Sequence, residues 1–224
     1  MVEEDVRRVV FHFDFVSPYS WLALMQAEAF GRRHGVEWVL RPVVYAALLD
    51  ASGLVGPAET SSKRNYTFHD VYRCAHRLGL RFEGPPAHPF RSIEVLRVAC
   101  LFQDEPAVLS LAVQLADACW GGGRPLTEPG VLEEVTAAVG FDAQDLERRI
   151  SRPEIKGLLR ENTEKAVGQG VFGVPSFLFG GQLFWGHDRL SHLADCLVGK
   201  GPDDFVEARR TLDRPRGADR RRRS

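Results

Sequence analysis

The order of strands and helices predicted at the two ends of the chain limits the possible folds most strongly. Residues 9–15 are almost all β-branched or aromatic, which predicts a first strand. Pro18 suits the first turn of a helix that Gly35 would end, and residues 36–40 predict a second strand. A strand, a helix and a strand in this order form a right-handed crossover, so the two strands should be parallel.

The rest of the chain divides into a long helical block and a C-terminal hairpin. Residues 46–167 contain no convincing strand. Strands return at 176–179 and 182–185, split by a Gly-Gly dipeptide suited to a tight turn, and a last helix is predicted at 189–197. The two ends should therefore complete one small sheet, covered by the helical block as an insertion. Helical stretches in that block are predicted at 63–78, 93–102, 107–120, 131–139 and 153–167.

We therefore expect an α/β domain formed by residues 7–45 and 168–205, a helical insertion at 46–167, and a basic, disordered tail at 206–224. Eight Arg and two Asp fall between 209 and 224, which leaves the body of the chain with a net charge of −7. An acidic body argues against a nucleic-acid-binding groove.

Composition and cysteine spacing exclude several classes of protein. With 44% hydrophobic and 26% charged residues the chain is typical of a globular protein. No apolar run approaches the ~18 residues of a membrane span. The acidic N-terminus is unlike a signal peptide, so we expect a cytoplasmic protein. The four cysteines are widely spaced without a C-x-x-C motif, so we expect reduced thiols and neither a metal site nor a dithiol redox site.

Ser17 lies just past the first predicted strand, where ligands of parallel sheets bind. A hydroxyl at the start of a helix lies among unpaired backbone N–H groups at the positive end of the helix dipole, where an anion such as a thiolate is stabilised. The alternative is that Ser17 only caps the helix, with Pro18 at its first position. No G-x-S-x-G motif surrounds Ser17, so a serine hydrolase is poorly supported.

Two other motifs need interpretation. Residues 168–173 match G-x-G-x-x-G, and Asp188 follows Gly168 by twenty residues. A dinucleotide-binding fingerprint follows a strand and opens a helix, whereas here a helix precedes and a strand follows. We therefore reject it and predict a helix end and a turn into the hairpin. Asp188 itself could cap the last helix or accept hydrogen bonds from a ligand ammonium group.

Several blocks of the chain resemble the DsbA superfamily of thioredoxin-fold proteins. Its oxidoreductases carry C-P-x-C where this chain has Ser17-Pro18-Tyr19-Ser20, and the serine version is similar to the 2-hydroxychromene-2-carboxylate isomerases and the kappa-class glutathione S-transferases. The resemblance implies a thioredoxin-like fold (βαβ, then ββα) with a large all-helical insertion. It rests on Phe13-Asp14-Phe15-x-Ser17-Pro18-Tyr19-Ser20, Arg41-Pro42, Lys63-x-x-Tyr66-x-x-x-Asp70-x-x-Arg73, Trp120, Phe172-Gly173-Val174-Pro175 and Trp185-Gly186-x-Asp188-Arg189-Leu190.

The resemblance also implies roles for individual residues. Ser17 would hydrogen-bond the glutathione thiolate. Pro175 would follow a cis peptide bond, which leaves the backbone of Val174 free to pair with the cysteinyl part of the tripeptide. Asp188, with His187 beside it, would hold the γ-glutamyl end of glutathione. Lys63 would hold a carboxylate of the tripeptide.

The resulting hypothesis is a glutathione-dependent isomerase that acts on an unsaturated, aromatic-derived keto acid. One alternative is a kappa-like transferase or peroxidase that acts on electrophiles. Another, from a different class, is a redox-inactive thioredoxin-fold binding protein. We expect glutathione and a small-molecule substrate as partners, no nucleic acid or membrane, and possible dimers, which are common in the families that the chain resembles.

Overall fold

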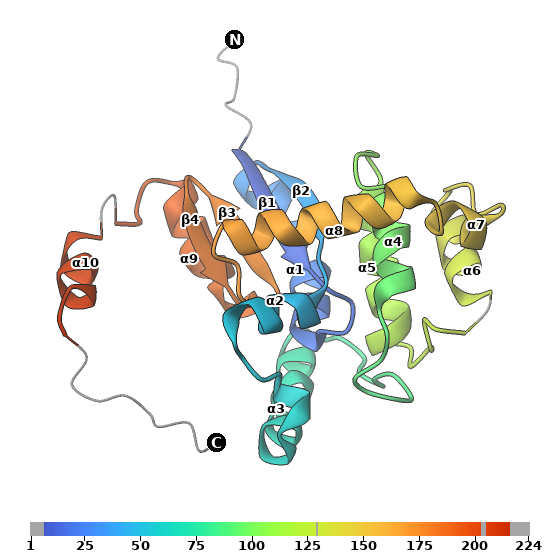
Figure 1. The fold of residues 1–224 in the computed structure, drawn as a ribbon, viewed down its shortest axis with the longest axis horizontal. Helices are drawn as coiled ribbons and strands as arrows, with labels where there is room; N and C mark the ends of the chain where they lie inside the picture. Colours follow the sequence, from blue (N-terminus) through green and yellow to red (C-terminus); the bar gives the residue numbers. More distant parts are fainter. Residues whose placement is uncertain (1–6, 129, 203–204, 216–224) are drawn as a thin grey trace, which may run out of the picture.

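The computed structural model describes residues 7–128, 130–202 and 205–215. Four strands form one sheet in the order β2-β1-β3-β4 (Figure 1). β1 (Arg7–Phe13) is parallel to β2 (Val36–Pro42) and antiparallel to β3 (Ser176–Phe179), which forms a hairpin with β4 (Gln182–Trp185). The predicted parallel pair and hairpin are thus confirmed. β1 ends two residues earlier than predicted because the chain turns at Asp14, whose carbonyl accepts a hydrogen bond from the Ser17 N–H.

The helical block lies between β2 and β3, and α1 (Pro18–His34) connects β1 to β2. The five helical stretches predicted in this block match observed helices to within two residues, whereas the sequence does not predict two short helices, α2 (Tyr45–Ser52) and α7 (Leu146–Ile150). The remaining elements are α2 (Tyr45–Ser52), η1 (Pro57–Glu59), α3 (Ser61–Arg77), α4 (Ile93–Leu101), α5 (Val108–Trp120), α6 (Val131–Ala138), α7 (Leu146–Ile150), α8 (Pro153–Gly168), η2 (His187–Arg189), α9 (Leu190–Leu197) and α10 (Val206–Leu212).

Hydrophobic residues alternate along β1 and so bury one face of the sheet. Val9, Phe11 and Phe13 are fully buried, as the two-residue period of a strand requires. Phe11 packs against Phe177 of β3, with ring centroids 4.7 Å apart. α8 crosses the sheet (Figure 1), and a second, smaller apolar cluster joins its last turns to α2 and to the loop before β3. The members of this cluster are Val43, Leu48, Ala166, Val171 and Val174.

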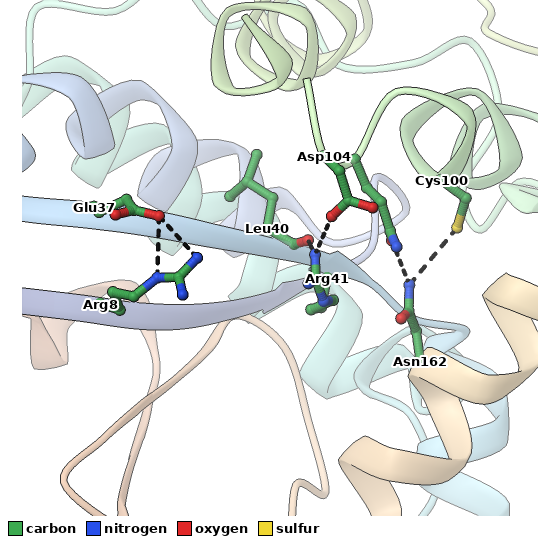
Figure 2. A network of polar contacts seen from close by, with 8 residues as sticks. Arg8, Glu37, Leu40, Arg41, Cys100, Asp104 and Asn162 are labelled. Carbon is green, nitrogen blue, oxygen red and sulfur yellow. Dashed lines mark hydrogen bonds and ion pairs between the residues drawn. The ribbon is translucent and has the colours of Figure 1, made fainter. Parts of the chain in front are cut away.

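A polar layer joins β2 to the helical block (Figure 2). The Arg41 guanidinium lies 3.5 Å from the carboxylate of Asp104. The buried Asn162 side chain of α8 donates a hydrogen bond of 2.9 Å to Gln103 and approaches the thiol of Cys100 at 3.8 Å. Burial raises the pKa of Cys100 to about 12, so this thiol stays protonated. These contacts therefore connect β2 and α8 to the segment that follows α4.

His12 should make the stability of the fold sensitive to acid. Its side chain is 2% exposed, and burial lowers its pKa to about 4, against the smaller opposing effects of the Gln169 side chain and the Arg41 backbone. Between pH 6.5 and pH 4 the unfolded chain therefore binds a proton that the folded chain does not. The free energy of unfolding should fall across this window as the pH falls, by up to about 3 kcal/mol from His12.

Urea unfolding at several pH values checks this prediction. The variant His12→Gln should lose part of the acid dependence, whereas replacement of the exposed His76 by Gln should leave it unchanged. Equal slopes for wild type and His12→Gln would show that His12 is not the group responsible.

The C-terminal part of the chain differs from the prediction. Residues 206–212 form α10, so the predicted disorder of the tail is wrong there; the run Arg220–Arg223 lies outside the described residues. Every strand of the sheet in the described part lies outside residues 46–167. Among the described helices, none combines the length and apolar character needed to cross a membrane.

Candidate functional site

Ser17 lies at the junction of β1 and α1, as predicted, and is 7% exposed. Its hydroxyl oxygen accepts a hydrogen bond of 3.2 Å from the Ser20 N–H, so Ser17 does cap the helix. The same hydroxyl donates to the carbonyl oxygen of Val174, 3.3 Å away. The cap uses only acceptor capacity, and the hydroxyl hydrogen can turn from Val174 to an anion. Capping and anion binding are therefore compatible at this residue.

Val174, which follows Ser17 by 157 residues in the sequence, forms the other side of the site together with Pro175. The peptide bond between them is cis, as the resemblance implied. The Pro175 carbonyl accepts from the Gly186 N–H at 2.9 Å, which continues the β3–β4 pairing up to the loop. Gly173 lets the Trp185 ring pack closely against the backbone, because a Cβ there would lie 2.6 Å from the ring nitrogen. The hairpin therefore sets the position of Val174 beside Ser17.

Asp14 organises the turn that leads into Ser17. Its fully buried carboxylate accepts hydrogen bonds from the N–H of Val16 at 3.0 Å and of Tyr45 at 2.9 Å. Burial raises the pKa of Asp14, and the Ser92 side chain and the two N–H groups oppose this rise. The carboxylate joins the turn to the first residue of α2 and leaves neither N–H without an acceptor.

Side chains from the helical block hold the carbonyl groups of the same turn. The indole N–H of Trp120, at the end of α5, donates to the Phe15 carbonyl at 2.8 Å. The His88 side chain, from the loop before α4, contacts the Val16 carbonyl at 3.1 Å. The turn before Ser17 is therefore fixed by the sheet on one side and by the insertion on the other. Sequence reasoning missed His88; a His-Pro dipeptide in a Pro-rich loop was the available signal.

Tyr19 connects α1 to both α3 and η2. Its hydroxyl donates to the Asp70 carboxylate at 2.9 Å, and its ring stacks on the His187 ring with centroids 5.5 Å apart and planes within 8°. Burial lowers the pKa of His187, against the opposing charges of Asp188 and Asp70, which favours the neutral ring. The stack brings the segment that contains Asp188 next to the first turn of α1.

Of the residues predicted for the ends of glutathione, Asp188 and Lys63 are exposed and His187 is half-buried. Asp188 forms an ion pair of 3.0 Å with Arg189. It does not cap the last helix, because η2 precedes α9 and the capping position falls on Arg189. Lys63 precedes Asp70 by two helical turns, so the two side chains share one face of α3. The structure thus brings Ser17 into contact with Val174, the residue before Pro175, and shows no hydrogen bond or ion pair of Lys63 with them among the described residues.

Comparison with known proteins shows the family and the fold of the chain. Residues 8–198 match the family model of the DSBA-like thioredoxin domain, and the chain belongs to this family. A solved structure of 2-hydroxychromene-2-carboxylate isomerase superposes with a TM-score of 0.78 over 92% of this chain and 100% of that chain, at 24% identity, which shows a common fold.

Two curated relatives match most of the chain. The 2-hydroxychromene-2-carboxylate isomerase of Sphingobium xenophagum is 28% identical over 194 residues, covering 86% of this chain and 98% of the relative. Human glutathione S-transferase kappa 1 is 27% identical over 208 residues, covering 87% and 92%. Both relatives are enzymes, and the chain is an enzyme.

Proposed function

We propose that the protein is a glutathione-dependent isomerase of the 2-hydroxychromene-2-carboxylate type. The observation that carries the proposal is the Ser17 hydroxyl, at the N-terminus of a 17-residue helix and 3.3 Å from the carbonyl of the residue before a cis proline. This arrangement offers one hydroxyl donor and a positive helix end to a thiolate, next to backbone that can pair with the attached peptide. Relatives that carry the isomerase name match over most of the chain.

The proposed reaction uses the thiol of glutathione as a reversible nucleophile. The thiolate adds to one carbon of the substrate double bond, and a proton completes the addition. The former double bond can then rotate as a single bond. Loss of the same proton and of the thiolate restores the double bond in the isomerised product. Ser17 donates its hydrogen bond to the sulfur anion before addition and after elimination, and it forms no covalent bond.

The two ends of the tripeptide are assigned to the exposed charges. Asp188 is the proposed acceptor for the γ-glutamyl ammonium group. The neighbouring His187 stacks on Tyr19, so the segment that carries Asp188 lies next to the first turn of α1. Lys63 is the proposed donor to a carboxylate, from the α3 face that also carries Asp70.

A thermal-shift experiment checks these assignments. Glutathione at 100 times its dissociation constant should stabilise the protein by ~2.7 kcal/mol, or about 5–10 °C. The variants Asp188→Ala and Lys63→Ala should each shrink the shift, whereas Asp195→Ala and Lys200→Ala, at exposed positions on and after α9, should not. An undiminished thermal shift in both Asp188→Ala and Lys63→Ala would show that glutathione binds elsewhere.

Turnover assays separate the proposed reaction from its main alternative. The kappa-class relatives match the chain over a similar length, which favours a transferase or peroxidase as the second candidate. The proposal expects glutathione-dependent interconversion of 2-hydroxychromene-2-carboxylate and its open keto acid, with little conjugation of aryl halides. Conjugation without isomerisation would favour the transferase, and neither reaction would favour a binding protein.

A further inference from the structure

The peptide plane that joins Val16 to Ser17 is held on both of its edges. On one edge the Ser17 N–H donates to the Asp14 carbonyl at 3.0 Å. On the other edge the Val16 carbonyl lies 3.1 Å from Nε2 of His88. A carbonyl can only accept, so Nε2 carries the hydrogen of this bond. The direction in which Ser17 projects its side chain depends on this plane.

The imidazole of His88 is itself fixed by aromatic rings of the insertion. It packs edge-on against Phe68 of α3, with centroids 5.2 Å apart, and against Trp120 of α5, at 5.5 Å. Arg64 donates to the His88 main-chain carbonyl at 3.5 Å. Nδ1 is buried and has no hydrogen-bond partner in the described part of the chain. The ring is therefore placed to make one hydrogen bond, and that bond goes to the residue before Ser17.

We propose that His88 is a positioning residue, which sets the Ser17 hydroxyl toward the thiolate by fixing the Val16–Ser17 peptide plane. The expected effect of His88 on turnover rests on the function proposed above, whereas the positioning of Ser17 by His88 does not. Small errors in the placement of a group that binds a reacting atom reduce rate strongly, and a second set of contacts normally holds such a group in place. Here the helical insertion supplies that support to a turn of the thioredoxin-like part.

Three substitutions separate positioning from packing. In His88→Gln the amide nitrogen can reach the former place of Nε2 and donate to Val16. The side chain of His88→Asn is too short to do so, and His88→Phe keeps the ring contacts but has no donor. Because one neutral hydrogen bond is lost, we expect kcat with glutathione to fall by roughly 3- to 10-fold in the Asn and Phe variants and to stay within about 2-fold in the Gln variant.

A second readout does not depend on glutathione. In a Ser17→Cys background, the thiol at position 17 should have a pKa lowered by the helix N-terminus, which is measured by alkylation against pH with peptide-resolved mass spectrometry. Adding His88→Phe or His88→Asn should raise this pKa and slow alkylation at neutral pH, and adding His88→Gln should not. The native cysteines in the same digest report whether the fold is intact.

The outcomes are distinct. A folded Phe or Asn variant with unchanged kcat and an unchanged thiol pKa at position 17 overturns the role of His88. If the wild type shows no glutathione-dependent turnover but the alkylation pattern is as expected, the proposed function fails and the positioning role stands. If the Asn and Gln variants lose the low thiol pKa and the Phe variant keeps it, packing of the ring and not its hydrogen bond is responsible, and the proposal fails.

Discussion

Replacement of Ser17 by Ala should lower glutathione-dependent turnover by roughly 10- to 150-fold. A hydrogen bond to a charged group contributes about 1.5–3 kcal/mol, and all of it is lost when the hydroxyl is removed. The apparent pKa of bound glutathione, read from thiolate absorbance against pH, should rise in the same variant. Stability cannot decide the question, because loss of the cap costs ~1 kcal/mol whether or not Ser17 binds the thiolate.

Ser20 provides the matched control for this experiment. Its hydroxyl is buried in the same turn of α1 and makes no hydrogen bond within the described residues, so Ser20→Ala should change turnover much less. Ser17→Cys should form a mixed disulfide with glutathione under mild oxidation, because the two sulfurs would be adjacent. Full turnover and an unshifted pKa of bound glutathione in Ser17→Ala would show that Ser17 only caps the helix.

Removal of the Asp14 carboxylate should produce the largest loss of stability among the residues of the site. In Asp14→Ala the partly buried N–H groups of Val16 and Tyr45 lose their acceptor, and each unsatisfied group costs about 1–3 kcal/mol. We expect the free energy of unfolding in urea to fall by about 2–5 kcal/mol. Asp14→Asn retains one acceptor oxygen and should lose less.

Glu59 is the control for this loss. Its carboxylate is exposed and accepts one backbone hydrogen bond, from Gly56 at 2.8 Å, whereas the carboxylate of Asp14 is buried and accepts two. Glu59→Ala should therefore cost about 1 kcal/mol or less. Similar losses in the Asp14 and Glu59 variants would mean that the turn before Ser17 tolerates unpaired N–H groups, and Asp14 would then not be the residue that organises it.

Local sequence patterns were sufficient for the elements that form the sheet. β1 is a run of β-branched and aromatic residues, and Gly180 and Gly181 both adopt the positive φ that a two-residue hairpin turn needs. The resemblance at Ser17-Pro18-Tyr19-Ser20 and Val174-Pro175 identified two segments that are in contact in the structure. The strand and the hairpin turn were predictable from neighbouring residues in the sequence, and the contact of the two segments from a recognisable motif.

The support of the site could not be predicted in the same way. Trp120 and His88 bond to the turn before Ser17 from segments more than 70 residues away, and nothing in their local sequence shows where the insertion folds back. α2 and α7 have eight and five residues, too few for a clear helical period. Asp188 was a plausible cap by spacing, but the intervening turn of 3-10 helix moved the capping position to Arg189.

Calorimetric titration of the protein with glutathione tests the central claim most directly. A free thiol has a pKa of ~8.5, so a site that binds the thiolate at pH 7 must release a proton. Titrations in buffers of different ionisation enthalpy should show saturable binding with net proton release. This release should be absent with S-methylglutathione and reduced in Ser17→Ala. No binding, or binding with the same proton balance for glutathione, S-methylglutathione and Ser17→Ala, would contradict the claim that Ser17 holds a glutathione thiolate.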